Sequence, residues 1–417
     1  MTEGIGVAVI GAGMAGRSHA HAYRTAQTVF GTGAPAIRLV AIADLNSEFA
    51  NHTAQRYGFE RAESSWQAIA DADDIDAVSI VVANHLHREI AEGLLAAGKH
   101  VLCEKPLAPT VEDAQAMVAA AGKSGRVASC GFSYRRSPAV AAIAELIRAG
   151  TLGRLLHFNG RYWCDYAANP DAPGSWRYAG PPGSGALADL GSHLIDLAEQ
   201  LCGPITVIRG ATLPIVIKDR PVPLGAALGH AAGVTVSAER EPVTNDDIAT
   251  FVAEFAGGAA GTFSISRVAM GHPNELAFEV FGTRAAARFD LSRNSEFGFV
   301  DSTPDSATNG WRRVVIGPEH PYVVAAQSMP FAGIGHGGQE FFTYQARAFL
   351  DEISGLDRLP RQATFADGLH NLQVERAITE AAATGSTATS SFIAITCARS
   401  AMGGTLSLGE GQDGRHT

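Results

Sequence analysis

Apolar positions in the first third of the chain fall into short continuous runs, and the stretches between them have helical spacing. The runs at residues 5–10, 39–43, 77–83 and 100–103 are apolar and rich in β-branched side chains. Strands that alternate with helices of this length predict βαβ units and a parallel sheet. We therefore expect a doubly wound α/β unit over residues 1–131, with ligands at the carboxyl ends of its strands.

Beyond Pro138 the pattern changes to short alternating runs separated by turns. Residues 250–255 and 261–266 flank a Gly-Gly turn and predict a hairpin, and residues 276–281 with 286–289 predict another. This alternation is typical of an antiparallel sheet. We expect residues 132–384 to form an α+β unit with a large, open, mainly antiparallel β-sheet.

Several further segments are assigned by spacing and composition. Leucines at helical spacing predict a helix over 188–201. Many Pro, Gly and Ala residues predict a long loop over 214–244, and Ser, Thr and Gly predict a disordered tail over 385–417. The C-terminal part of the second unit is expected to contain helices over 341–353 and 365–382, which can pack back on the first unit.

The first strand runs directly into a glycine-rich turn that is followed by a helix. Gly11, Gly13 and Gly16 are spaced as in a Rossmann dinucleotide-binding unit: the first permits a tight turn, the second lets backbone approach a pyrophosphate, and the third lets helix pack on strand. The N–H groups of Met14 and Ala15 open the helix and suit phosphate binding. The alternative is a glycine turn without a ligand.

An acidic residue ends the second strand. Asp44 lies 28 residues after Gly16 rather than the usual interval of about 20, and we attribute the excess to a loop around 31–35. A carboxylate here accepts hydrogen bonds from the adenosine ribose and repels a 2′-phosphate. Leu45 and Asn46 offer no cation to receive that phosphate. We expect NAD as cofactor, with NADP less favoured.

Composition narrows the class of protein. The chain has 417 residues, 46% hydrophobic and 18% charged, with a net charge of -10, which describes a soluble globular protein and argues against a nucleic-acid partner. A chain of this length accommodates two or more cores. Its longest apolar runs are far shorter than the roughly 20 residues of a membrane span, so no membrane partner is expected.

Cysteine usage and the N-terminus suggest the compartment. The five cysteines form no CxxC pair and leave at least one unpaired, which favours a reducing compartment and neither a metal site nor a disulfide framework. No basic region or cleavage site precedes the strand at residue 5, so no signal peptide is expected. A cytoplasmic location is the simplest prediction.

Two stretches carry candidate chemistry. Lys105 follows the strand 100–103 at the carboxyl edge of the predicted sheet, near where a nicotinamide would lie, although with no other signal a surface lysine is the favoured interpretation. Asp189 and His193 are four residues apart, so they share one face of a helix. An imidazole titrates near physiological pH, which suits His193 to a general base. Asp196 suits orienting the helix as well as touching a substrate.

Four motifs occur together in order: GAGMAG at 11–16, VANHLH at 82–87, CEKP at 103–106 and DLGSH at 189–193. Together they resemble the glucose-fructose oxidoreductase / inositol dehydrogenase family of NAD(P)-dependent sugar and polyol dehydrogenases, over roughly residues 4 to 384. The resemblance implies hydride transfer between nicotinamide and a secondary hydroxyl of a sugar, anhydrosugar, glycoside or cyclitol. It implies these catalytic residues: Lys105, Asp189 and His193.

The resemblance also implies binding residues. Family members usually carry Thr-Pro where this chain has Val82-Ala83, so the turn before Asn84 is less rigid here while its backbone contacts stay possible. The cofactor contacts implied beyond the glycine turn and Asp44 are Val82, Ala83, Asn84, His87, Glu104, Lys105, Arg135 and Trp176. The substrate contacts implied are Lys105, Tyr134, Trp163, Asp165, Arg177, Asp189, His193 and His336.

The flanks of a Pro-rich loop refine this resemblance. Trp163 and Asp165 on one side, Trp176 and Arg177 on the other, and His336 in a Gly-rich segment look most like the levoglucosan-type and 3-keto-sugar-forming dehydrogenases. Aromatic faces stack on the C–H surfaces of sugars while polar groups read hydroxyls. Trp176 fits a plain core position nearly as well.

Three functional hypotheses and one assembly hypothesis stay open. The chain is an NAD(P)-dependent oxidoreductase, a dinucleotide-sensing protein that lost its chemistry, or an oxidoreductase that recycles a tightly held cofactor. We expect a homodimer or homotetramer paired through the open sheet. The side chains expected to line one or other face of that sheet are Phe251, Ala253, Phe255, Phe263 and Ile265.

Overall fold

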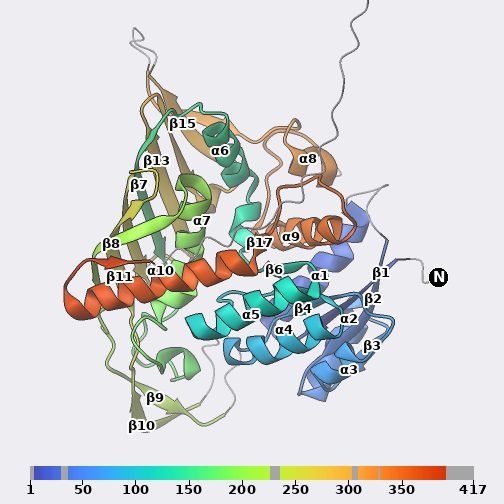
Figure 1. The fold of residues 1–417 in the computed structure, drawn as a ribbon. Helices are drawn as coiled ribbons and strands as arrows, with labels where there is room; N and C mark the ends of the chain where they lie inside the picture. The colour runs from blue at the N-terminus through green and yellow to red at the C-terminus, as the bar shows by residue number, and fades with distance from the viewer. Residues whose placement is uncertain (1–3, 30–35, 226–234, 303–308, 327–328, 391–417) are drawn as a thin grey trace, which may run out of the picture.

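The structure is a computed structural model that describes residues 4–29, 36–225, 235–302, 309–326 and 329–390. Two large sheets, one of seven strands and one of nine, dominate the described part of the chain. Figure 1 shows them side by side, with helices between and around them, and a smaller two-stranded sheet below the larger one.

The seven-stranded sheet is the predicted doubly wound unit. Its order is β17-β6-β5-β4-β1-β2-β3, and every pair among β1 to β6 is parallel. The prediction of an N-terminal Rossmann sheet is therefore confirmed. Its strands are β1 (Ile5–Ile10), β2 (Ile37–Ala43), β3 (Arg61–Glu63), β4 (Ala77–Ile80), β5 (His100–Cys103), β6 (Ala128–Cys130) and the antiparallel β17 (Ala363–Thr364).

The crossover helices begin where the sequence supplies capping groups. Asn46 accepts hydrogen bonds from two N–H groups at the start of α2, and Thr110 accepts one at the start of α5. α2 and α5 end at Gly58 and Gly125, both with positive φ. The helices of this unit are α1 (Met14–Val29), α2 (Ser47–Tyr57), α3 (Trp66–Ala70), α4 (His87–Ala96) and α5 (Val111–Ser124).

The nine-stranded sheet is mainly antiparallel, as predicted, and only β7 and β12 pair in parallel among its described strands. Both predicted hairpins, β11–β12 and β13–β14, are present. Its order is β16-β15-β14-β13-β7-β12-β11-β8-β18. The strands are β7 (Leu155–Trp163), β8 (Ile205–Thr212), β11 (Ile248–Phe255), β12 (Ala260–Ser266), β13 (Glu275–Gly282), β14 (Ala285–Asp290), β15 (Glu296–Asp301), β16 (Arg312–Val315) and β18 (Ala388–Thr389).

One face of this sheet is covered and carries the core. Figure 1 shows α6 (Pro138–Arg148), α7 (Ser192–Cys202) and α10 (Phe365–Thr384) on the same side of the sheet, toward the seven-stranded unit. Five side chains expected to line one or other face of the sheet lie on the covered face and are buried beneath these helices, because they alternate with the outward positions. They are Phe251, Ala253, Phe255, Phe263 and Ile265.

Two expectations for irregular segments need correction. Residues 214–244 are not one long loop, because β9 (Asp219–Pro223) pairs with β10 (Val236–Pro242); residues 226–234 between them lie outside the described part. Arg220 on β9 is fully buried and donates to the main-chain oxygens of Asn169 and Ala167, so it anchors this arm. The predicted tail is also structured at its start, where β18 pairs with β8; residues 391–417 lie outside the described part.

The two C-terminal helices return to the first unit. Phe349 and Leu350 of α9 (Gly338–Ile353) share a core with Val7 and Tyr23, while α10 packs against α5 and β6. The predicted helices over 341–353 and 365–382 are therefore confirmed. α8 (Pro321–Ala326) precedes them.

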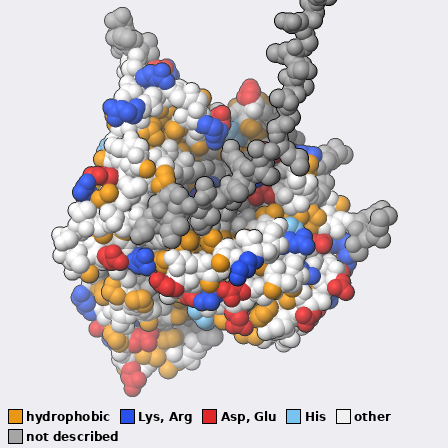
Figure 2. All heavy atoms as spheres, in the orientation of Figure 1, with side chains coloured by type: hydrophobic (Ala, Val, Ile, Leu, Met, Phe, Trp, Pro, Cys, Tyr) orange, Lys and Arg blue, Asp and Glu red, His pale blue; other side chains and the backbone are white. Residues whose placement is uncertain are grey.

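The described residues show no membrane-spanning helix and a surface of mixed charge (Figure 2). None of the described helices is long and apolar enough to cross a membrane. On the face shown in Figure 2, acidic and basic side chains are interspersed rather than gathered by sign. The described cysteines, Cys103, Cys130, Cys164 and Cys202, are all buried free thiols.

A buried ion pair lies at the base of β11 and β12. Arg267 and Asp247 are 1% and 0% exposed, and Nε of Arg267 lies 2.8 Å from Oδ1 of Asp247. The other oxygen of Asp247 accepts from the N–H groups of Val216 and Ile217. Removing one partner of such a pair leaves an uncompensated charge in the interior.

We predict that Asp247→Ala lowers the free energy of unfolding by about 3–5 kcal/mol, because it strands the guanidinium of Arg267 away from water. Urea unfolding followed by circular dichroism measures this. The matched control is Glu254→Ala, which breaks an exposed pair with Arg209 on the same sheet and should change stability little. Equal losses in the two variants would contradict the prediction.

Candidate functional site

The glycine turn between β1 and α1 has the geometry that a pyrophosphate needs. Gly11 has φ +109°, a left-handed value that favours glycine, and a Cβ at Gly16 would lie 1.8 Å from the main-chain oxygen of Gly11. A Cβ at Gly13, by contrast, would meet no described atom within 4 Å. Gly13 and Met14 are exposed at the helix N-terminus, so this cradle fits the phosphates of a dinucleotide.

Asp44 ties the end of β2 to this turn. Its Oδ2 accepts from the N–H of Ala12 at 2.7 Å, and its Oδ1 accepts from the N–H of Asn46 at 2.8 Å. The carboxylate is therefore fixed beside the glycine turn and half-exposed. That position suits the adenosine ribose.

The turn after β4 is supported from below by a buried histidine. The ring nitrogens of His87 lie 3.1 and 3.2 Å from the main-chain oxygens of Val82 and Leu107. Burial lowers the pKa of His87, while its hydrogen bonds to these carbonyl oxygens oppose that shift. The expected direct cofactor contact from His87 is wrong, because the side chain is fully buried; Val82, Ala83 and Asn84 lie half-buried at the sheet edge.

Glu104 belongs to a chain of polar groups beneath the same edge. Its Oε1 lies 2.9 Å from Nε2 of His19, whose Nδ1 lies 3.1 Å from Oγ of Ser79. The hydroxyl of Tyr23 is 2.8 Å from the same Oγ. Glu104 also accepts from the N–H of Lys105, so the carboxylate orients the residue that follows it.

Lys105 reaches from the first unit to the helix of the second. Its Nζ donates to the main-chain oxygen of Asp189 at 2.8 Å and to Oδ1 of the same residue at 3.3 Å. The hydroxyl of Tyr166 donates to Oδ2 of Asp189 at 2.8 Å. The reading of Lys105 as an ordinary surface lysine is wrong, since its side chain is only 15% exposed.

His193 lies four residues beyond Asp189 in an aromatic setting. The predicted helix over 188–201 is confirmed, but its first turn is a π-helical turn, Leu187–Gly191, before α7. The imidazole lies 4.5 Å from the ring of Tyr134 between centroids. Burial, and then the charge of Lys105, lower the pKa of His193 well below its usual value, while Asp189 opposes this. The ring is neutral and can accept a proton.

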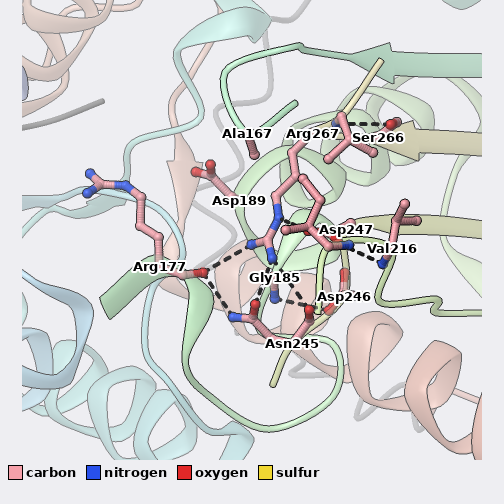
Figure 3. A network of polar contacts seen from close by, with 12 residues as sticks. Ala167, Arg177, Gly185, Asp189, Val216, Asn245, Asp246, Asp247, Ser266 and Arg267 are labelled. Carbon is pink, nitrogen blue, oxygen red and sulfur yellow. Dashed lines mark hydrogen bonds and ion pairs between the residues drawn. The ribbon is translucent and has the colours of Figure 1, made fainter. Parts of the chain in front are cut away.

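Asp246 fixes the start of that π-helical turn. Its Oδ1 accepts from the N–H groups of Gly183 and Gly185, and its Oδ2 from the N–H of Leu187 at 2.8 Å. Figure 3 shows Asp246 and Gly185 meeting beside the buried pair of Asp247 and Arg267. The element that carries Asp189 is thus held by a fully buried carboxylate.

The same network holds Arg177 by its backbone. The main-chain oxygen of Arg177 accepts from Arg267 and from Asn245, each at 3.0 Å. Figure 3 shows its side chain running away from this network. The guanidinium stacks on Trp176, 4.4 Å from the ring centroid. Trp176 is 64% exposed, so the alternative that it is a core residue is wrong.

Two side chains expected to contact ligands bond to other residues of the chain. Arg135 forms a two-point ion pair with the buried Asp196, at 2.6 and 2.8 Å, so Asp196 holds α7, while the cofactor contact of Arg135 stays a prediction. Trp163 bonds Ser264 on the outer face of the large sheet, because it alternates with Tyr162, which faces His193. Within one subunit its expected substrate contact is therefore wrong.

The remaining expected residues lie at defined places. The ring of Tyr134 packs against that of His193 at an interplanar angle of 36°, and its hydroxyl lies 2.8 Å from that of Tyr162. Asp165 accepts from the N–H of Gly271 at 3.3 Å. His336 lies 3.2 Å from Oγ of Ser295.

Sequence reasoning missed Tyr166, Asp246 and Tyr162. Tyr166 lies near a recognised Trp and Asp, but nothing local reveals that its hydroxyl reaches Asp189. Asp246 sits in an Asn-Asp-Asp run at the start of β11, and three consecutive polar residues before an apolar strand were the available signal.

The centre therefore joins a cation, a carboxylate and a neutral imidazole. Lys105 can stabilise negative charge on an oxygen, His193 can take up a proton, and Asp189 holds the cation. No group of three or more potential metal ligands occurs among the residues that the structure describes. The arrangement suits acid–base chemistry beside a bound dinucleotide.

Comparison with known proteins agrees with this geometry. Residues 5–132 match the family described as "Oxidoreductase family, NAD-binding Rossmann fold", and residues 140–288 match the "GFO/IDH/MocA C-terminal domain". The chain is 37% identical over 385 residues to levoglucosan dehydrogenase of Pseudarthrobacter phenanthrenivorans, covering 91% of this chain and 97% of that protein.

Solved structures show the same likeness. Levoglucosan dehydrogenase in complex with NADH and levoglucosan has a TM-score of 0.83 and 35% identity, covering 93% of this chain and 99% of that one. The complex with NADH and L-sorbose has a TM-score of 0.84 at the same identity and coverage.

We predict that His193 stays neutral at pH 6.5, and that Lys105→Met raises its pKa because a nearby positive charge is lost. NMR titration of histidine-labelled protein measures this, with His193→Ala to assign the signal. Lys123→Met, on the surface of α5, is the control and should leave the titration unchanged. A His193 signal that titrates near pH 6.5 in the wild type would contradict the prediction.

Proposed function

The chain belongs to the oxidoreductase family with an NAD-binding Rossmann fold and a GFO/IDH/MocA C-terminal domain, and from that premise we propose that it oxidises a secondary hydroxyl of a sugar or anhydrosugar with NAD. The observation that carries the proposal is the contact of Lys105 with Asp189, four residues before the neutral His193. The names of the relatives support a levoglucosan-like substrate.

His193 acts as the general base. Oxidation of an alcohol carbon requires that the hydroxyl proton leave, and a neutral imidazole can accept it. NAD, when bound, supplies the acceptor for the hydride. The proton goes to His193 rather than to Lys105, because Lys105 is an ammonium group that donates to two oxygens of Asp189.

Lys105, held by Asp189, stabilises charge on the substrate oxygen. The ammonium, held on Asp189, stabilises the negative charge that builds on that oxygen as its proton departs. Tyr166 restrains the other oxygen of Asp189, so the carboxylate keeps one orientation. Charged donors that are already in place at the start of the reaction need no reorganisation.

The outer parts of the site select the ligands. Gly13, Met14 and Ala15 receive the pyrophosphate, and Asp44 receives the adenosine ribose. Other cofactor contacts come from Val82, Ala83, Asn84, Glu104 and Trp176. Substrate contacts come from Tyr134, Asp165, Arg177 and His336. A cytoplasmic location and assembly as a homodimer or homotetramer stay predictions.

We predict that His193→Ala lowers turnover by roughly 10² to 10⁴, the usual contribution of a general base, with little change in NAD affinity. Lys105→Ala should be at least as damaging, and Lys105→Arg should not rescue it, because a guanidinium differs in shape and hydration. NADH formation at 340 nm with levoglucosan in a panel of sugars measures turnover.

The pH dependence sharpens this test. Because the pKa of His193 lies well below its usual value, the wild-type rate should show no His193 step between about pH 6.5 and 8. The control is His52→Ala on the exposed face of α2, which should keep full turnover. Near-normal turnover in His193→Ala would mean that another group is the base.

We predict that catalytic efficiency is higher with NAD than with NADP, and that Asp44→Ser narrows the preference by removing a charge that repels a 2′-phosphate. Initial rates with each cofactor at saturating sugar measure this. Asp71→Ser, at the exposed end of α3, is the control and should leave the ratio unchanged. Equal or better efficiency of the wild type with NADP would overturn the assignment.

A further inference from the structure

One face of α10 runs along the element that carries Asp189 and His193. Asp367, Asn371, Glu375 and Thr379 recur every four residues, so they share this face. Asp367 pairs with Arg135 at 3.3 Å. Farther along this face, Asn371 contacts Ser192 and Thr379 lies beside Gly183, on either side of the π-helical turn.

Two contacts of neighbouring residues on α10 show which part of the chain lies beside Glu375. One turn before it, Nδ2 of Asn371 donates to the main-chain oxygen of Ser192 at 2.9 Å. One turn after it, Oγ1 of Thr379 lies 2.4 Å from where a Cβ of Gly183 would be. Glu375 is therefore level with the turn between Gly183 and Ser192, where Lys105 bonds to the main chain.

Glu375 is a buried acid on this face of α10. Glu375 is 6% exposed, and its Oε1 has no hydrogen-bond partner among the described residues. The charged groups that act on it are Lys105 and Asp246. Burial raises the pKa of Glu375 to about 8; Lys105 lowers it and Asp246 raises it. At neutral pH the carboxyl is uncharged.

Glu375 is a second acid close enough to Lys105 for their charges to interact. The ammonium of Lys105 is now held by two oxygens of Asp189, at 2.8 and 3.3 Å. A neutral Glu375 offers little competition for it. An ionised Glu375 in the same low-dielectric surroundings would attract the ammonium strongly, because Coulomb attraction grows as the dielectric falls.

We propose that Glu375 is a positioning residue for the proposed oxidation: as a neutral acid it leaves Lys105 on Asp189 at the substrate oxygen, and as a carboxylate it draws Lys105 away. The proposal rests on the proposed function of the site. It assigns no contact between Glu375 and the substrate. The proton that Glu375 loses goes to solvent base, and no bond to carbon changes.

The first test compares pH profiles of turnover for the wild type and Glu375→Gln, with NAD and levoglucosan, between pH 6 and 10. Gln keeps the shape of the neutral acid but cannot ionise. One pH unit above an ionisation at about 8, roughly a tenth of the sites stay neutral, so wild-type turnover should fall about tenfold by pH 9. Glu375→Gln should match the wild type within about twofold at pH 6.5 and lack this fall.

The matched control is Glu380→Gln on the same helix. The side chain of Glu380 is 60% exposed, and its carboxylate lies 3.9 Å from the guanidinium of Arg376. It should keep the wild-type profile, including the alkaline fall. If Glu375→Gln and the wild type fall in parallel, Glu375 does not act on Lys105 and the proposal is overturned.

A second measurement reads the ionisation of Glu375 without any activity. The folded pKa lies above the ordinary value of 4.5, so between these values the folded state holds a proton that the unfolded state has lost. Stability of the wild type therefore falls as pH rises through this window. The Tm of Glu375→Gln minus that of the wild type should rise from pH 5 to pH 8 and level off above it.

The two measurements separate the two claims. If levoglucosan and the other sugars give no turnover while the Tm difference rises with pH, the proposed function fails and Glu375 still titrates as described. If the Tm difference is constant with pH, Glu375 is ionised throughout, and the proposal is overturned whatever the enzyme oxidises.

Discussion

The contact between Lys105 and the main chain of Asp189 is the constraint on which the site depends. It joins the carboxyl edge of one sheet to the first turn of a helix on the other, across 84 positions of sequence. A π-helical turn at Leu187–Gly191 brings this carbonyl to the lysine, and such turns are frequent at functional sites. If either unit shifted by an ångström, the ammonium of Lys105 would lose its two acceptors on Asp189. The proposed oxidation would then lack the cation that stabilises the substrate oxygen.

The buried polar run Asn245, Asp246 and Asp247 explains how that turn is kept in place. Each carboxylate captures main-chain N–H groups, and Arg267 is the cation that allows Asp247 to be buried. Taking these groups out of water is costly, and apolar residues would often stabilise a fold better. The network holds the main chain at Arg177 and the start of the helix that carries Asp189 and His193, as a supporting shell does in well-organised sites.

Much of the fold could be read from the sequence, because the decisive signals are local. The glycine turn, Asp44, the two hairpins and the C-terminal helices follow from spacing within a few residues. The two-stranded arm over 219–242 was missed because Pro and Gly mask its strands, and its anchor, Arg220, bonds to a distant loop.

The site was harder to read, since side-chain direction depends on which face of a strand or helix is covered. Trp163 and Tyr162 are neighbours, yet only Tyr162 faces His193, and this follows from where α7 packs. Glu375 looks like any helical glutamate in the sequence. Its burial is a consequence of tertiary packing, which a single sequence does not display.

The charges at the centre also explain why each group has its role. With Lys105 positive, Asp189 negative, and His193 and Glu375 neutral, the four groups carry no net charge at neutral pH. In the proposed oxidation, proton transfer to His193 would leave a cation beside Lys105, which raises the energy of that imidazolium and helps it to release the proton. The same two cations stabilise the negative oxygen while it exists. A histidine that was already charged could not accept the hydroxyl proton, so the burial that keeps His193 neutral leaves it able to serve as the base in the proposed oxidation.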